Sequence, residues 1–216
     1  MTETPQMSRI PTGLVSTQLA FTQFALALTT LVVAMFGAQG ASQAATQPIV
    51  VSAHSSTAAA NCWPIDGSKE AADNATRVCR GKATWVVLVN KDAGRETVSV
   101  GHNRVEAAKE PAAQASFGPF KVALPSIEWR TAGNNPFAII QRWRTTDSDT
   151  KPMLVVTKLP PGAVCPVAYV DAAANPDADE LARQAADQIA RDFKCGTDQP
   201  KVLGTSGRTA EFATKR

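Results

Sequence analysis

Hydrophobic and polar residues alternate through the middle of the chain with the two-residue period of β-strands. Thr84–Asn90 is a short apolar run rich in β-branched residues, and Arg95–Val100 alternates apolar with polar positions. Asp92 and Gly94 lie between the two runs, and both residue types favour tight turns. The pattern therefore predicts a β-hairpin over residues 84–100.

A stronger β pattern begins after residue 136 and predicts a second hairpin. Phe137, Ile139 and Trp143 recur at even spacing, whereas Arg142 falls in the opposite series. This spacing predicts a strand with one buried face and one solvated face. A polar turn leads from this strand to Met153–Leu159, its expected partner.

Tryptophans and arginines gather on two neighbouring β segments and allow two interpretations. The residues are Trp129, Arg130, Arg142, Trp143 and Arg144. We expect the tryptophans to belong to the core and the arginines to its wet reverse side, because Trp143 shares a series with apolar residues. The alternative is a sheet face that binds an anionic surface or a glycan.

Further short strands are expected on either side of this hairpin. Phe120–Leu124 and Ile127–Thr131 are extended pieces separated by Pro125. Ala163–Asp171 is another strand, and its Pro166 requires a sheet edge or a bulge because proline has no N–H for the ladder.

The last predicted element is a long helix over Asp177–Lys194. Its first turn is acidic, and Asp177 and Glu180 have the spacing of a capping box. An apolar stripe repeats every four residues, formed by Leu181, Ala185, Ile189 and Phe193. Two ion pairs at i, i+4 are expected within the helix, namely Asp179 with Arg183 and Asp187 with Arg191.

The N-terminal region differs sharply from this pattern. Between Ile10 and Ile65 there is no Asp, Glu, Lys or Arg, and Leu19–Ala38 is an apolar stretch. Arg9 precedes the stretch, and small residues, Ser42 and Ala44 among them, follow it. This order predicts a signal peptide over residues 1–44, and hence a periplasmic or secreted protein. The alternative is an uncleaved anchor in the inner membrane formed by residues 19–38.

The remaining chain is long enough for one domain. Residues 45–61 are uncharged and rich in small side chains, which indicates a linker with a possible short edge strand at Pro48–Ser52. We expect a single exported α+β domain over residues 62–204 and a flexible tail over residues 205–216.

All four cysteines lie in this expected domain. A strand leaving Cys165 and a helix returning over it would bring Cys195 back beside Cys165. Cys62 would then pair with Cys79 and close a turn-rich loop, although four cysteines also allow two other pairings. Their spacing contains no C-x-x-C motif, so we expect no metal site and no cofactor.

Charge and motifs restrict the function without identifying it. The net charge of +3 is too small to indicate a nucleic-acid partner. No phosphate-binding loop, G-x-S-x-G elbow or H-E-x-x-H motif is present. A hydrolytic site would have to combine His102 with a carboxylate such as Glu106 or Asp171 and an unidentified serine. The simpler interpretation is that His102 is an exposed loop residue.

The C-terminal part of the domain resembles known exported proteins. The block Pro152–Gly204 contains PMLVVTKLPPGAVCPVAYVD, NPDADELARQAAD and FKCGTDQPKVLG, and it resembles small exported proteins of Gram-negative bacteria that have no assigned function. The plan of an exported β-rich domain with two cysteine pairs is similar to the invasion-associated locus B family. The resemblance carries over no functional residue, because that family's motifs are not matched.

These observations lead to one fold and two functional hypotheses. The expected fold is an α+β domain, an antiparallel sheet of about five or six strands with one long C-terminal helix on one face and two disulfides. The first hypothesis is a noncatalytic binding or envelope-accessory protein whose partner is an unknown protein or envelope component. The membrane would take part only through an uncleaved N-terminal segment. The second hypothesis is a periplasmic hydrolase with a site around His102.

Overall fold

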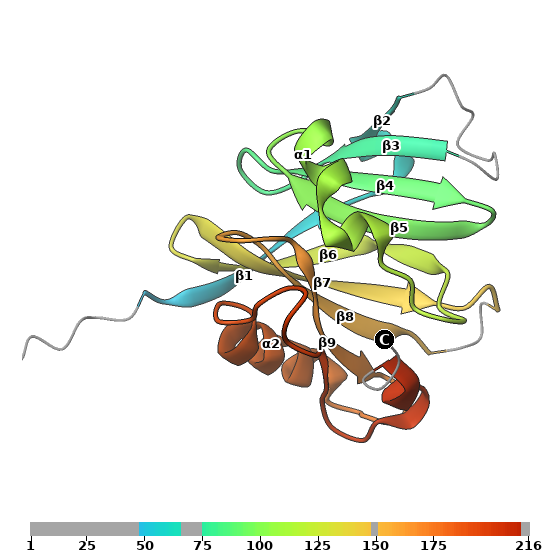
Figure 1. Cartoon of the computed structure of the whole chain (residues 1–216), viewed down its shortest axis with the longest axis vertical. Coiled ribbons are helices and arrows are strands. Elements are labelled where there is room, and N and C mark those ends of the chain that lie inside the picture. The colour runs from blue at the N-terminus through green and yellow to red at the C-terminus, as the bar shows by residue number, and fades with distance from the viewer. Residues whose placement is uncertain (1–47, 66–74, 148–150, 213–216) are drawn as a thin grey trace, which may run out of the picture. The chain divides into compact units, whose positions relative to one another are not determined.

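The chain folds into two β-sheets with two α-helices, as seen in a computed structural model that describes residues 48–65, 75–147 and 151–212 (Figure 1). The six-stranded sheet has the order β1-β6-β7-β8-β9-β10. Its strands are β1 (Val50–Ser56), β6 (Val122–Ala132), β7 (Asn135–Arg144), β8 (Met153–Lys158), β9 (Cys165–Asp171) and β10 (Lys201–Val202). All neighbours are antiparallel except β9 and β10, which are parallel.

The second sheet has four antiparallel strands in sequence order. They are β2 (Cys62–Pro64), β3 (Ala75–Arg80), β4 (Val86–Asp92) and β5 (Arg95–Gly101). Helix α1 (Arg104–Lys109) packs beside β4 and β5, and helix α2 (Ala178–Ile189) packs against β7, β8 and β9 (Figure 1). Short 3-10 turns occur at Ala59–Asn61, Pro111–Gln114 and Gly207–Phe212.

Both predicted hairpins are confirmed, as β4–β5 and β7–β8. The bulge expected at Pro166 is also present, because the β8–β9 register shifts where Thr157 faces this proline. The prediction of a single sheet of five or six strands is wrong, because the strands form two sheets, one of six strands and one of four. Strands β2 and β3 lie in the segment that the sequence indicated to be a loop. The mainly β architecture with helices is otherwise consistent with an α+β fold.

Two apolar clusters hold the layers together. The first lies between the sheets and joins Val87, Val89 and Val100 of the smaller sheet to Ile139 and Met153 of the larger one. The second lies between the larger sheet and α2. The larger sheet is therefore apolar on both faces over β7, β8 and β9, as expected for strands covered on both sides.

Because the larger sheet is covered on both faces, the structure tests where the clustered tryptophans and arginines lie. Trp129 and Trp143 are buried in the first cluster, as expected for core residues. The prediction that the arginines lie on a solvated reverse side is wrong, because the opposite face of β7 lies against α2. Arg142 forms an ion pair with Asp179 of this helix instead of facing solvent alone.

Helix α2 is shorter than predicted and uses its charges differently. It ends at Ile189, five residues before Lys194, and Asp177 makes no side-chain capping hydrogen bond. The predicted pairs within the helix are replaced by bonds to the sheet, because the sheet offers oppositely charged partners from β6 and β7. The buried face of α2 consists of small residues, which allow the close approach that these bonds require: Ala178, Ala182, Ala185 and Ala186.

The boundaries expected for the domain also change. The linker predicted over residues 45–61 is wrong for residues 50–56, because β1 pairs with β6 without a register shift from Val50 to Ser56. This edge strand is longer than the one expected at Pro48–Ser52. The predicted signal peptide and the apolar stretch over residues 19–38 lie outside the described residues. In the described part of the chain, no helix is both long and apolar enough to cross a bilayer.

The C-terminal segment is not a flexible tail over its described length, residues 205–212. Arg208 donates from two guanidinium nitrogens and from its backbone N–H to the carboxylate of Asp171, at 2.5 to 3.0 Å. Asp171 is only 1% exposed, and burial acts to raise its pKa. The hydrogen bonds from Arg208 and from the Ala173 N–H outweigh this effect and lower the pKa to about 2.

We predict that Asp171→Asn destabilises the protein in a pH-dependent manner. Because the pKa of Asp171 falls from 3.8 to about 2 on folding, its ionised form stabilises the fold above pH 3.8, and this contribution disappears towards pH 2. The variant should lose about 2 kcal/mol of unfolding free energy at pH 7. Urea titrations at several pH values measure this, with the exposed Asp92→Asn as control. A loss that stayed constant down to pH 2 would contradict the assignment.

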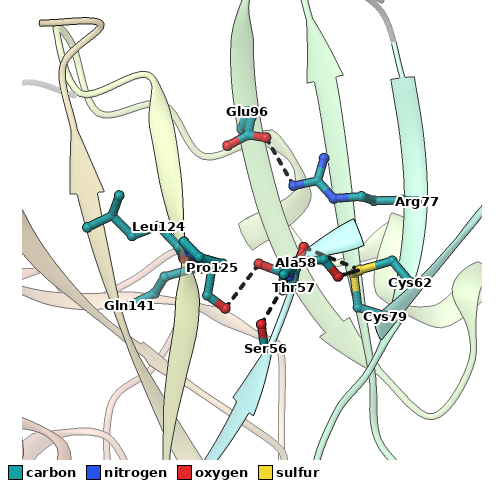
Figure 2. The surroundings of a disulfide bond; sticks show 10 residues. All are labelled: Ser56, Thr57, Ala58, Cys62, Arg77, Cys79, Glu96, Leu124, Pro125 and Gln141. Atoms are coloured by element: carbon teal, nitrogen blue, oxygen red, sulfur yellow. Dashed lines mark hydrogen bonds and ion pairs between the residues drawn. A yellow bond between two sulfur atoms is a disulfide. The ribbon is translucent and has the colours of Figure 1, made fainter. Parts of the chain in front are cut away.

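The two disulfides are Cys62–Cys79 and Cys165–Cys195, the pairing favoured by the strand and helix geometry. Cys62 lies directly opposite Cys79 in the β2–β3 ladder. Figure 2 shows this bond beside the Thr57–Cys62 segment, which joins the two sheets. The second disulfide ties β9 to the segment after α2. Disulfides of this kind are consistent with an oxidising, exported location.

A buried carboxylate connects the two sheets close to the first disulfide (Figure 2). Glu96 of β5 accepts a hydrogen bond from the Arg77 guanidinium of β3 at 3.1 Å. Its other oxygen accepts the backbone N–H of Ala123, on β6 of the larger sheet, at 2.8 Å. One side chain therefore satisfies groups from both sheets and fixes their relative position.

We predict that removing either disulfide by a double Cys→Ser substitution lowers the free energy of unfolding by about 3 kcal/mol. The bonds span 17 and 30 residues, so the entropy model gives them similar values, the longer loop slightly more. Urea unfolding of the two double variants and of the oxidised parent measures both losses. A variant as stable as the parent would show that its bond does not restrict the unfolded chain.

Candidate functional site

The outer face of the smaller sheet carries an exposed tryptophan beside an arginine. Side chains alternate along a strand, so Trp63 and Arg80 point to the side opposite the Cys62–Cys79 bond. Trp63 is 52% exposed although tryptophan is usually well buried. The guanidinium carbon of Arg80 lies 5.3 Å from the centroid of the Trp63 ring, within the range of a cation–π contact.

These two residues form one end of a concave surface that we call the aromatic groove. Its volume is about 410 Å³. The groove is lined by residues of β2, β3 and the turn that leads into β4: Trp63, Arg80, Gly81, Ala83, Thr84, Trp85 and Val86. Ligand sites are commonly concave, with aromatic walls and a few polar groups, and the groove has this composition.

Backbone hydrogen bonds hold the turn in the groove. Gly81 donates to the Trp85 carbonyl, and Trp85 donates to the Lys82 carbonyl, both at 3.0 Å. Ala83 has a φ of 54°, a conformation that is unfavourable for residues with a side chain. The turn therefore has a defined shape, and it presents Lys82 and Thr84 to solvent.

Gly81 lines the groove and lies against the core. A Cβ at this position would lie 2.7 Å from the Trp85 carbonyl oxygen and 2.9 Å from two ring carbons of Trp129. Trp129 is fully buried, and its indole N–H donates to the Ser55 hydroxyl of β1 at 2.8 Å. Only glycine allows this contact between the groove and the core.

Two basic side chains accompany the groove, Arg80 in its lining and Lys82 in the adjoining turn. Arg80 and Lys82 lie two residues apart, and His102 stacks on Trp85 with ring centroids 4.0 Å apart. Within the described ranges, neither Arg80 nor Lys82 has a carboxylate at ion-pair distance. The charge of these two cations is thus available to a ligand from solvent.

In the described residues, neither carboxylate considered for a hydrolytic site is bonded to the imidazole of His102. The ring of His102 is exposed, with its Nδ1 3.3 Å from the Thr84 hydroxyl. Glu106 accepts the backbone N–H of His102 at 3.0 Å and the Asn103 amide at 2.7 Å, and Asp171 binds Arg208. In the described residues, each carboxylate therefore has a structural partner other than the imidazole.

Asn103 and Glu106 instead cap helix α1 reciprocally. The Asn103 side chain accepts the Glu106 backbone N–H at 2.9 Å, which satisfies a donor that the first helical turn leaves free. The Glu106 carboxylate in turn fixes the backbone at His102. This capping arrangement explains the acidic residue near the histidine without any catalytic role.

We predict that Asn103→Ala lowers the free energy of unfolding by about 1 kcal/mol, because the capping acceptor is lost. Asn103→Ser keeps a capping oxygen and serves as the control, with most of the stability retained. Chemical denaturation of the three proteins measures the difference. Equal losses in both variants would indicate that the side-chain amide acts through Glu106 and not through the cap.

A charged cluster between β1, β6 and α2 is a second candidate, but its groups bind one another. Arg183 and Ser52 donate to Glu128, while Arg130 donates to Asp187 at 2.6 and 3.0 Å. Burial acts to raise the pKa of Glu128, and the hydrogen bonds from Arg183 and Ser52 outweigh it and lower the pKa. The cluster fastens α2 to the sheet and leaves these carboxylates paired.

A second concavity of about 400 Å³ lies beside the Cys165–Cys195 bond. Its walls include Phe117, Tyr169 and Pro166, and its lining contains no charged side chain. It lacks the charged groups that would orient a ligand, which makes it a weaker candidate than the aromatic groove.

Sequence reasoning overlooked Trp63, Arg80 and Trp85. A signal was nevertheless present, because the Cys62–Cys79 pairing fixes the register of β2 against β3. With that register, Trp63 and Arg80 are diagonal neighbours on one face. The pairing was predicted, but its consequence for the flanking residues was not.

Comparisons with known proteins do not assign this surface. No family model matches the chain, and no curated protein or solved structure matches it significantly. Function must therefore be inferred from the groove itself.

Proposed function

We propose that this chain is an exported, noncatalytic binding protein whose ligand occupies the aromatic groove. The observation that carries the proposal is the half-exposed Trp63, held beside Arg80 on a disulfide-bonded strand. A large aromatic ring left in solvent forgoes the stabilisation of burial, and a ligand that covers the ring recovers it.

The rigidity of the groove supports binding. Strand β2 is bonded to β3 by Cys62–Cys79, and the turn over residues 81–85 is closed by two backbone hydrogen bonds. A site that is already shaped loses less conformational entropy when a ligand binds. The groove thus has the properties of a preformed recognition surface.

The surroundings of His102 support binding in preference to hydrolysis. In the part of the chain that the structure describes, Glu106 is used in the cap of α1 and Asp171 holds Arg208. General-base catalysis needs a group oriented towards the proton that it removes, and neither carboxylate is directed at the imidazole.

The N-terminal region and the disulfides together support the proposed exported location. Residues 1–44 have the order of a signal peptide, and the two disulfides are consistent with an oxidising compartment. In this proposal, the protein acts in the periplasm or outside the cell on an envelope component.

Site-specific photocrosslinking in cells tests the proposal. The full chain carries a benzophenone amino acid at position 63, and the control chain carries it at position 180, an exposed site on α2. We expect adducts from position 63 that are absent from position 180. Equal or absent adducts at both positions would overturn the proposal, as would turnover of small ester or glycoside substrates by the purified protein in a manner dependent on His102.

A further inference from the structure

We infer that the ligand of the aromatic groove is an acidic saccharide, with a sugar ring on Trp63 and a carboxylate on Arg80. The inference rests on the proposed function and names its ligand class. It is drawn from the charge, the shape and the ring arrangement of the groove.

The charge of the groove selects an anion. Arg80 lines the groove and Lys82 is exposed in the adjoining turn, and both side chains carry positive charge. Tryptophans alone would suit a cationic ligand, as they do in aromatic cages. The basic residues beside them would repel such a ligand. A negatively charged group is therefore the complementary partner.

The geometry of Arg80 suits a carboxylate. Its guanidinium lies over Trp63, so the ring restricts the arginine while the N–H groups remain free to donate. A planar guanidinium can bind both oxygens of a carboxylate at once, which gives orientation as well as attraction. No side-chain hydrogen bond from Arg80 to another described residue competes with such a contact.

The aromatic walls suit the rest of a sugar. The faces of a pyranose ring carry C–H groups that pack on an indole, while the hydroxyl groups around its edge need hydrogen-bond partners. Thr84 supplies a hydroxyl group at the groove, and the turn over residues 81–85 supplies backbone polar groups. A cavity of about 410 Å³ has room for a small ligand or one part of a longer chain.

An anionic membrane surface is the competing partner, because tryptophan and basic residues also occur at lipid interfaces. The groove is less suited to this partner. Trp63 lies in a strand joined to β3 by the disulfide, and Arg80 covers part of its ring. A membrane anchor must instead project its apolar side chain freely into the lipid.

Calorimetric titration of the purified oxidised protein tests the inference. The probe is trigalacturonate, and its fully methyl-esterified form is the matched neutral ligand with the same sugar rings. We expect the acid to bind at least roughly tenfold more tightly than the ester, because charged hydrogen bonds to Arg80 are lost in the ester. Binding of the acid should weaken as salt is added.

Three variants and one control locate the binding. Arg80→Gln should reduce the affinity for the acid roughly tenfold to a hundredfold and leave that for the ester nearly unchanged. Trp63→Ala should weaken both ligands, and Trp63→Phe should restore part of the loss. Arg191→Gln is the matched control, because Arg191 also covers an aromatic ring, 4.2 Å from the centroid of Phe137, at the other face of the protein's larger sheet.

The results separate the inference from the proposed function. Equal affinity for acid and ester, or equal losses in Arg80→Gln and Arg191→Gln, would overturn the inference. Binding to vesicles of phosphatidylglycerol and phosphatidylcholine without binding to trigalacturonate would also overturn the inference. That result would indicate an anionic membrane surface as the partner. If crosslinks form at position 63 while the saccharide does not bind, only the ligand class is wrong. If neither occurs, the proposed function fails as well.

Discussion

The covalent bond between Cys62 and Cys79 is the constraint on which the outer face of the smaller sheet depends. Strand β2 has only three residues, too few for its ladder alone to hold it against β3. The disulfide fixes the two strands in register and buries Cys79 in the core between the sheets. As a result, the neighbouring Trp63 is held at the surface beside Arg80. Core packing and the exposed groove thus depend on opposite faces of the same bonded pair of strands.

Polar contacts determine how the layers fit together in this fold. Apolar packing between the sheets favours burial but does not specify one position, because it has little directionality. Glu96 adds direction, since its two oxygens bind groups from different sheets. On the other side of the larger sheet, Arg130 and Glu128 bind charged residues of α2. Leaving any of these buried groups unpaired would be costly, so the native arrangement is strongly preferred.

The elements that depend on neighbouring residues were predictable from the sequence. The β4–β5 hairpin follows from alternation around a turn, and Cys165–Cys195 follows from a strand and a returning helix. The second sheet was not predictable, because β2 and β3 meet across a polar segment whose pattern indicated a loop. The charges of α2 were assigned to partners within the helix because spacing reports only local neighbours. Asp179 and Asp187 instead find arginines on strands far away in the sequence. The groove was missed for the same reason, since the exposure of Trp63 depends on its strand partner.

Gly81 connects the groove directly to the core, because it lines the groove and lies close to the buried Trp129 ring. Because a side chain at this position would collide with the Trp129 ring, it could be accommodated only by moving the largest fully buried side chain among the described residues. Substitutions that leave the core unchanged are therefore expected at the rim, at positions such as Lys82 and Thr84 that are exposed to solvent. The wall of the groove at Gly81 is therefore constrained by the core, whereas its solvent-exposed rim is not.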